Sequence, residues 1–191
     1  VQTCALPIYL DDLFNAAETL SRVPRLDGDR LLIVTNGGGA GVLAADRLAD
    51  LGGTLAALDR KLVDALDSVL PATWSRGNPV DIIGDAGPER WAAALGPILE
   101  IEGSDALLAL ACPTALASGD AAAEAVLASI GAVSGRGAKP PKPLLTCWLG
   151  DGAAAGPRRR FAEAGVASFP TPAAAVEGFM QLVAHARAQD E

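Results

Sequence analysis

The sequence predicts an α/β fold with a doubly wound parallel sheet, in the flavodoxin-like three-layer α/β/α arrangement. Short apolar runs with the length of buried strands alternate along the chain with longer segments of helical periodicity. Such alternation is typical of parallel strands joined by right-handed helical crossovers, which place helices on both faces of the sheet. Half of the 191 residues are hydrophobic and 20% are charged, so the chain holds enough apolar side chains for a sizeable core.

We expect two parts: an N-terminal helical extension over residues 1–28 and the sheet domain over residues 29–191. In the extension, apolar residues between Tyr9 and Arg22 recur at the spacing of one helix face. A polar linker follows from Pro24. The first eight residues, VQTCALPI, carry neither an initiator Met nor the charged start of a signal peptide. We therefore expect this stretch to be a non-native addition to a fragment of a longer protein.

The sheet domain begins with two strand–helix units. The apolar run Arg30–Thr35 predicts a strand, and a helix is expected from about Gly41 to Leu51, where two glycines end it. A second strand is expected over Thr54–Leu58. The helix after it runs to Leu70, with an aspartate as its N-cap and a proline beyond its end.

The next two units follow the same pattern. Asn78–Ile83 is expected as a short strand entered from a turn, and Pro88 suits the first turn of a helix over Glu89–Leu99. The apolar run Asp105–Cys112 has the length of a fully buried strand. A helix is expected over Ala115–Ile130, because its Ala, Val and Leu residues share one face.

The last third of the chain completes the sheet. A loop rich in Gly, Pro and Lys is expected over 131–142, followed by a strand over Pro143–Trp148. A helix over Ala153–Ala164 ends at a glycine. Ser168–Phe169 is expected as a short edge strand, and a threonine caps the final helix, from Pro172 to about Arg187.

Composition excludes several classes of function. The net charge of -8 argues against nucleic acid and anionic membranes as partners, because phosphate backbones are bound by clusters of Lys and Arg. The one basic cluster, Arg158–Arg160, is expected to be a solvated helix face. No apolar run reaches membrane-spanning length. The cysteines Cys4, Cys112 and Cys147 lack the spacing of a disulfide framework or, with His185, of a metal site, so we expect a cytoplasmic protein without bound metal.

A glycine-rich motif follows the first strand. Asn36 stands at the carboxyl end of that strand, where ligands of open α/β sheets bind, and Gly37, Gly38 and Gly39 come next. Backbone N–H groups at such a helix start can bind phosphate or carboxylate. The segment also fits G-x-G-x-x-A, with Asp59 at the end of the next strand, which is the spacing of an NAD-type fingerprint. Close strand–helix packing explains the glycines equally well.

A second candidate lies after the central strand. Thr114 is expected to cap the following helix, leaving the N–H groups of Ala115 and Leu116 free at the same edge of the sheet as Asn36. Two helix N-termini would then converge on one anion pocket. An ordinary capped helix is the alternative interpretation.

Structural roles are expected for several other residues. Asp81 is expected to accept backbone hydrogen bonds from a neighbouring loop, and Asp85 to cap the helix at Pro88. Trp148 either covers a ligand or packs against the helix after it, and His185 is expected at the surface. Catalytic triads, Cys–His pairs and carboxylate dyads do not emerge, so the residues alone indicate a binding or assembly domain.

Three ordered motifs resemble one enzyme family. TNGGGAGVLAAD at 35–46, GNPVDIIGDAGPER at 77–90 and LTCWLG at 145–150, preceded by LDDLFNAAETL at 10–20, are similar to segments of the NDP-forming acyl-CoA synthetases. This family includes ADP-forming acetate–CoA ligases and the ligase-like part of certain bacterial protein lysine acetyltransferases. The domain is more remotely similar to the C-terminal domain of the succinyl-CoA synthetase β subunit.

The resemblance implies a role within a larger enzyme. A phosphohistidine, carried by an upstream domain, would be held by helix N-termini, one of them from this domain. Asn36 would contact the acyl substrate, the three glycines would bind phosphate, and the segment from Thr114 to Leu116 would face both. The complete enzyme would use CoA, ATP or ADP and Mg, together with a CoA-binding domain and an ATP-grasp domain. No catalytic residue is expected in this chain, which alone would be inactive. An NAD-binding domain and a non-catalytic assembly module remain the alternatives.

Overall fold

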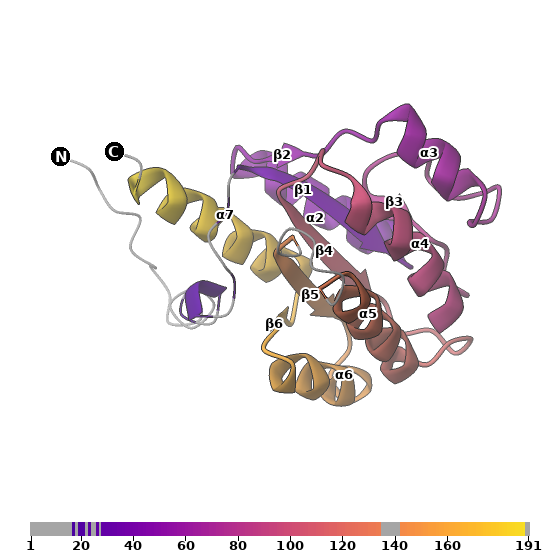
Figure 1. Cartoon of the computed structure of the whole chain (residues 1–191). Helices are drawn as coiled ribbons and strands as arrows, with labels where there is room; N and C mark the ends of the chain where they lie inside the picture. Colours follow the sequence, from indigo (N-terminus) through magenta and orange to yellow (C-terminus); the bar gives the residue numbers. More distant parts are fainter. Residues whose placement is uncertain are drawn as a thin grey trace.

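The computed structural model describes residues 28–134 and 142–189, together with residues 17, 19–21, 23 and 26. Figure 1 shows a parallel sheet between two layers of helices. The strands are β1 (Arg30–Thr35), β2 (Thr54–Leu55), β3 (Val80–Asp81), β4 (Ala106–Ala111), β5 (Leu144–Trp148) and β6 (Ala167–Phe169). The helices are α2 (Gly38–Asp50), α3 (Arg60–Asp67), α4 (Pro88–Glu100), α5 (Gly119–Ser134), α6 (Gly152–Glu163) and α7 (Pro172–Gln189).

The strand order is β2-β1-β4-β5-β6, and β3 pairs with the end of β1 beyond β2. All of these pairs are parallel. The chain therefore leaves β1 toward one edge of the sheet and later returns to place β4 on the other side of β1. This reversal is a topological switch point, and ligands of open α/β sheets bind in the crevice beyond the strand ends there.

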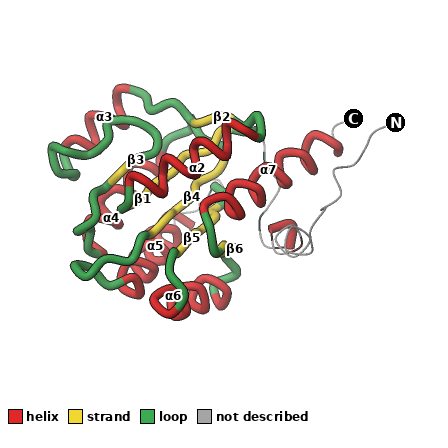
Figure 2. Tube along the Cα trace, turned by 180° about the vertical axis from the view of Figure 1, so that it is seen from behind, coloured by secondary structure: helices red, strands yellow, loops and turns green. Residues whose placement is uncertain are grey.

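Side chains of alternate residues in the central strands pack into two separate hydrophobic cores, one on each face of the sheet. Leu32 and Val34 of β1 join a core with α3, α4, α5 and α6, whereas Leu31 and Ile33 join a core with α2 and α7. Figure 2 shows α2 and α7 side by side on the second face. A strand buried on both faces has this pattern, since successive side chains point in opposite directions. The predicted doubly wound fold is confirmed.

Local capping signals place several helix ends as predicted. Asp59 accepts a hydrogen bond from the Leu62 N–H at 2.7 Å, and Thr171 accepts one from the Ala174 N–H at 3.1 Å. Pro88 opens α4, where its missing N–H costs nothing. Gly165 follows α6 with a φ of +73°, a conformation that glycine adopts without strain.

The starts of two helices differ from the prediction. α2 begins at Gly38, three residues early, so that the glycine motif is the first turn of the helix and not a turn before it. α5 begins at Gly119, four residues late. Its cap is Ser118, whose hydroxyl accepts from the Ala121 N–H at 3.3 Å. Strands β2 and β3 are shorter than expected, with two residues each.

The expected N-terminal helix lies mostly outside the described residues. Within it, residues 17 and 19–21 are helical. Thr19 is fully buried and lies close to α7, because a Cβ on Gly178 would be 2.8 Å from its hydroxyl oxygen. Across residues 28–134 and 142–189, no helix combines the length and the apolar composition needed to cross a membrane.

Candidate functional site

Asn36 joins two loops at the switch point. The residue is 6% exposed, its Nδ2 donates to the Cys112 carbonyl at 3.0 Å, and its Oδ1 accepts from the Cys112 N–H at 2.7 Å. The amide thus holds the loop after β1 against the loop after β4. An asparagine amide has a second N–H and a second oxygen lone pair, so one donor and one acceptor position remain for a ligand.

Close neighbours crowd two of the three predicted glycines, Gly37 more severely than Gly38. A Cβ on Gly37 would lie 2.4 Å from the Cys112 Sγ, and a Cβ on Gly38 would lie 2.7 Å from the Asp81 Oδ2. A Cβ on Gly39 would meet nothing within 4 Å. The packing interpretation therefore explains Gly37, whereas at Gly38 the end of the Asp81 side chain could move aside. The Asp81 carboxylate also places negative charge at the start of α2, where it competes with any bound anion.

The loop after β4 differs from the predicted helix start. Thr114 precedes α5 by five residues, and its hydroxyl accepts only a long hydrogen bond, 3.4 Å, from the Leu116 N–H. The prediction that Thr114 caps α5 is wrong, because Ser118 takes this position. Ala115 and Leu116 are exposed loop residues, with Leu116 at 77%. Their N–H groups do not form the first turn of a helix.

A cavity of about 120 Å³ lies between these loops. Asn36 and Thr114 both contribute to its wall, as the sequence predicted, whereas the three glycines, Ala115 and Leu116 are absent from it. The remaining lining comes from the ends of β4 and β5, the loops after β3, β4 and β5, and the first turns of α4, α5 and α6. Its residues are Ala86, Trp91, Ala111, Cys112, Pro113, Ala117, Ser118, Gly119, Ala122, Trp148, Leu149 and Ala153.

Two tryptophans form part of the cavity wall. Trp91 of α4 is fully buried, and its ring centroid lies 5.7 Å from that of Trp148. Trp148 packs in turn on Phe161 of α6 at 4.7 Å, and its indole N–H donates to the Gly119 carbonyl at 3.1 Å. The packing interpretation of Trp148 is therefore confirmed. No sequence motif pointed to Trp91, whose only local signal is an aromatic residue in the first turn of an apolar helix.

The loop after β3 closes one side of the site. A Cβ on Gly84 would lie 3.6 Å from the Asn36 carbonyl oxygen and 3.9 Å from the Thr114 methyl group. Ile83 has a φ of +70°, which is strained for a β-branched residue. Its N–H donates to the Asp81 Oδ1 at 2.9 Å, so Asp81 stabilises its own loop and not a neighbouring one.

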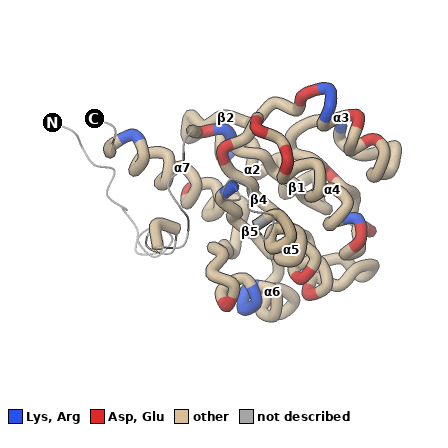
Figure 3. Tube along the Cα trace, in the orientation of Figure 1, with Lys and Arg blue, Asp and Glu red and all other residues tan. Residues whose placement is uncertain are grey.

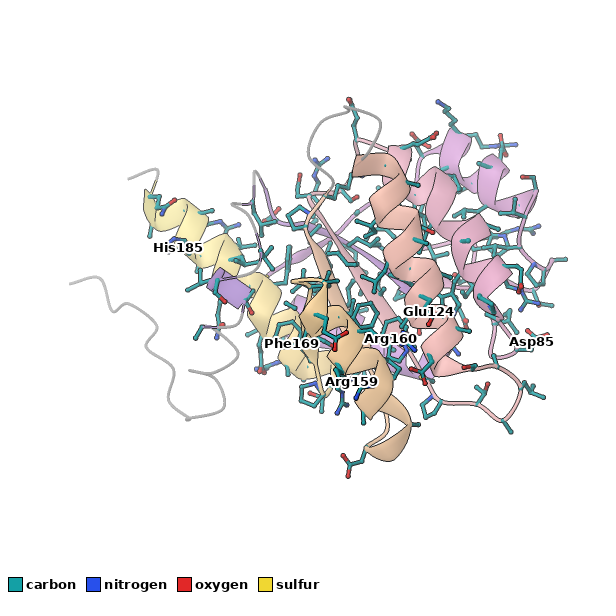
Figure 4. The ribbon with its side chains drawn as sticks, turned by 60° about the horizontal axis from the view of Figure 1, so that its bottom comes forward. Asp85, Glu124, Arg159, Arg160, Phe169 and His185 are labelled. Carbon is teal, nitrogen blue, oxygen red and sulfur yellow. The ribbon has the colours of Figure 1, made fainter. Side chains whose placement is uncertain are left out.

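Asp85 and His185 are not among the residues that line the cavity. Asp85 pairs with Arg90, whose guanidinium lowers the pKa of this carboxyl group, and Gly87 is the N-cap of α4. The expectation that Asp85 caps this helix is wrong. His185 is exposed near the end of α7, as predicted, with Nε2 2.9 Å from the Gln189 amide nitrogen (Figure 4).

The basic cluster lies on α6, where Figure 3 colours it blue, and its arginines are bound more closely to the fold than predicted. Arg158 donates to the Trp148 carbonyl at 2.7 Å. Arg160 pairs with Asp120 at 3.2 Å and with Glu124 at 2.9 Å, both on α5. Of the three arginines, Arg159 alone fits a solvated face. The cluster therefore fastens α6 to β5 and α5.

The two described cysteines are not activated nucleophiles. Burial raises the pKa of the Cys147 thiol to about 12 and raises that of the half-buried Cys112, whose pKa is raised further by the nearby charge of Asp81. Both are free thiols. Among the described residues, no group of His, Cys, Asp and Glu could hold a metal ion.

The features that favoured NAD binding have other uses in the structure. Asp59 caps α3, and Gly39 lies in the first turn of α2 with open space around it. Gly41 packs closely on the sheet, because a Cβ there would lie 3.0 Å from the Thr35 methyl group. The geometry thus gives no support to the dinucleotide alternative.

Relatives of this chain are longer enzymes. The chain is 31% identical over 173 residues to "Acetate--CoA ligase [ADP-forming] I" of Archaeoglobus fulgidus. This alignment covers 91% of this chain and 23% of the relative. It is 29% identical to the α subunit of the corresponding Pyrococcus furiosus ligase, covering 91% of this chain and 36% of that subunit. The chain thus spans about a quarter to a third of these relatives.

Solved structures agree with this relationship. The fold matches the apo form of the dinucleotide-forming acetyl-coenzyme A synthetase 1 of Ca. Korarchaeum cryptofilum with a TM-score of 0.87 and 30% identity. That match covers 96% of this chain and 39% of the synthetase chain. The same synthetase has been solved in complex with phosphate and ADP. A family model of the Ligase-CoA domain matches residues 31–182. The chain therefore belongs to the Ligase-CoA domain family.

Proposed function

We propose that this chain is one domain of an NDP-forming acyl-CoA synthetase, and that its loops after β1 and β4 form one wall of the acyl-phosphate and phosphohistidine site. The observation that carries the proposal is the pairing of Asn36 with Cys112. It holds the two loops together at the switch point, beside a cavity that Asn36 and Thr114 line. Membership of the Ligase-CoA family supports the same location.

The residues at this wall bind and orient, and the reacting groups come from elsewhere. The nucleophilic histidine belongs to an upstream domain, while CoA, ATP or ADP and Mg are bound by the other domains of the complete enzyme. These are the CoA-binding domain, the phosphohistidine-bearing domain and the ATP-grasp domain. The free thiols of Cys112 and Cys147 fit a reducing compartment, and we place the enzyme in the cytoplasm.

Asn36 and Thr114 supply the polar contacts of the wall. The unused N–H of the Asn36 amide donates to an oxygen of the acyl phosphate, and the Thr114 hydroxyl donates to another. The start of α2 adds about 0.3–1 kcal/mol for a nearby anion, and the Asp81 carboxylate beside Gly38 reduces this amount. The side-chain donors therefore contribute more to binding than the three glycines do.

The test uses the full-length enzyme and measures acyl-CoA-dependent ATP formation. Thr114→Val removes the hydroxyl and keeps the branched shape, so kcat/KM should fall by about 10-fold to 150-fold, the value of a hydrogen bond to a charged group. Thr114→Ser restores the hydroxyl and should recover most of the activity. Thr54→Val makes the same change on the exposed strand β2 and should have no effect. Wild-type kcat/KM in Thr114→Val would contradict the proposal.

A further inference from the structure

The sheet has a gap along one side of β1. On this side β1 pairs with β2 through Arg30 and Leu31, and with β3 through Val34 and Thr35. Within residues 28–134, neither strand pairs with the two residues between them. The second motif of the sequence, GNPVDIIGDAGPER at 77–90, enters the sheet at this gap and has no role in the function proposed above.

The side-chain amide of Asn78 fills the gap. Its Oδ1 accepts from the Ile33 N–H at 3.0 Å, and its Nδ2 donates to the carbonyl groups of Leu31 and Ala56, both at 2.9 Å. A side-chain amide offers the same kinds of donor and acceptor as a peptide group. Asn78 thus takes the place of the missing strand residue, and the N–H of the fully buried Ile33 finds the partner that a buried peptide group requires.

The outer edge of β3 is held by a second side chain. The Ser75 hydroxyl donates to the Pro79 carbonyl at 2.7 Å and accepts from the Asp81 N–H at 2.9 Å. These two backbone groups stand on either side of Val80, in a strand of only two residues. Side chains of the preceding loop therefore fix β3 from both edges, where a longer strand would be fixed by its own ladder of backbone hydrogen bonds.

The position of β3 determines where the next loop lies. The Ile82 N–H donates to the Thr35 carbonyl at 2.8 Å, directly after the strand. Two residues further on, a Cβ on Gly84 would lie 3.6 Å from the Asn36 carbonyl oxygen and 3.9 Å from the Thr114 methyl group. A shift of β3 along β1 would therefore move this loop against the two residues that form the polar wall of the site.

We propose that Asn78 and Ser75 are positioning residues for the site. They fix β3 in its register on β1 and thereby hold the loop after β3 beside Asn36 and Thr114. Neither residue lines the cavity, so both act through that loop and not by contact with the substrate. The proposal rests on the function proposed above, because the wall that they position is the wall of that site.

The test uses the full-length enzyme and acyl-CoA-dependent ATP formation. Asn78→Ala removes the amide, and Ser75→Ala removes the hydroxyl. Ser75→Thr restores the hydroxyl at the same position. Thr171→Ala is the matched control, because Thr171 is also exposed and also bonds a backbone N–H through its hydroxyl, at the start of α7. Urea unfolding of each variant identifies a temperature at which all of them are folded.

A displaced site wall lowers the rate more than it lowers stability. A misplacement of about 1 Å can cost on the order of 100-fold in rate, so kcat should fall by about 10-fold to 100-fold in Asn78→Ala and in Ser75→Ala. Ser75→Thr should recover most of this loss, and Thr171→Ala should keep the wild-type kcat. If Asn78→Ala does not fold, the exposed Ser75 still carries the comparison.

A double variant shows whether Ser75 acts on the wall that contains Thr114. Changes at independent sites have additive free energies, so their effects on kcat/KM multiply. If Ser75 positions the loop against Thr114, Ser75→Ala and Thr114→Val together should lower kcat/KM by less than the product of the two separate effects. A combined effect equal to that product would overturn the positioning role.

The remaining outcomes separate this inference from the function on which it rests. Wild-type kcat in Asn78→Ala and Ser75→Ala, in an enzyme that Thr114→Val impairs, would overturn the positioning role and leave the proposed function standing. A loss in Ser75→Ala that Thr171→Ala matches, or that Ser75→Thr does not recover, would also overturn it. If Thr114→Val has no effect either, both proposals fail.

Discussion

Replacing Asn36 with alanine removes the only side-chain bridge that we identify between the β1 and β4 loops within the described residues. The variant loses the bonds of 2.7 and 3.0 Å to the Cys112 backbone. Each such bond contributes about 0.5–1.5 kcal/mol, and an unpaired backbone group adds about 1–3 kcal/mol if it stays dry. Because Cys112 is only half-buried, water recovers part of that loss. We expect Asn36→Ala to lower the free energy of unfolding by about 2–4 kcal/mol.

Urea unfolding of this chain, followed by circular dichroism and analysed by linear extrapolation, measures the change. Thr114→Val serves as the control, since its half-exposed hydroxyl makes one bond of 3.4 Å and its loss should cost less than about 1 kcal/mol. We expect Asn36→Ala to lower the stability of the fold, and Thr114→Val to lower the activity of the full enzyme with little loss of stability. If Asn36→Ala lowered the free energy of unfolding by less than about 1 kcal/mol, with an unchanged urea slope, the Asn36 side chain would not hold the two loops together.

Three further outcomes follow from local geometry. Gly37→Ala should destabilise the chain by about 1–3 kcal/mol, because its Cβ would lie 2.4 Å from a sulfur, whereas Gly39→Ala, in open space within α2, should stabilise it by up to about 1 kcal/mol. Arg30 lowers the pKa of Asp105, so the pair contributes stability above the ordinary carboxyl pKa that is lost as the pH falls through the lowered value. Below about pH 4, the free energy of unfolding of Asp105→Asn should therefore fall less steeply with decreasing pH than that of the wild type. Cys147, with a pKa of about 12, should resist iodoacetamide at pH 8 until the chain unfolds, as peptide mass spectrometry would show.

Each of these outcomes has a contrary result. Equal stabilities of Gly37→Ala and Gly39→Ala would mean that the two loops are not in close contact. If the free energy of unfolding of Asp105→Asn fell with decreasing pH as steeply as that of the wild type, the Arg30–Asp105 pair would not contribute to the pH dependence of stability. Asp50→Asn, on the exposed surface, serves as the control. Alkylation of Cys147 in the folded chain would show that β5 is open to solvent.

Features that depend on adjacent residues could be predicted from the sequence. The alternation of apolar runs predicted six parallel strands, and the caps at Asp59 and Thr171 lie where a polar residue precedes a helical pattern. The start of α5 could not be placed in this way. Pro113–Thr114 and Ser118–Gly119 are both plausible helix starts, and the hydrogen bond from Trp148 to the Gly119 carbonyl comes from 29 residues away.

The site was predictable only in part for the same reason. Asn36 and Thr114 stand after apolar strands, and parallel strands bring their carboxyl ends to one edge, so their proximity followed from topology. The partner of Asn36 lies 76 residues away, and no local pattern indicates that pairing. The cavity wall gathers Trp91, Trp148 and Ala153 from three segments. Its volume depends on packing that the sequence does not display.

A crystal structure of the complete enzyme in its phosphohistidine form, with the acid bound, would show directly whether Asn36 and Thr114 belong to the phosphohistidine site. We expect the phosphoryl group and the carboxyl group beside Asn36 and Thr114, within hydrogen-bond distance of the amide nitrogen and the hydroxyl. A phosphohistidine bound against other loops, with the edge between β1 and β4 facing solvent, would show that this domain does not form the phosphohistidine site.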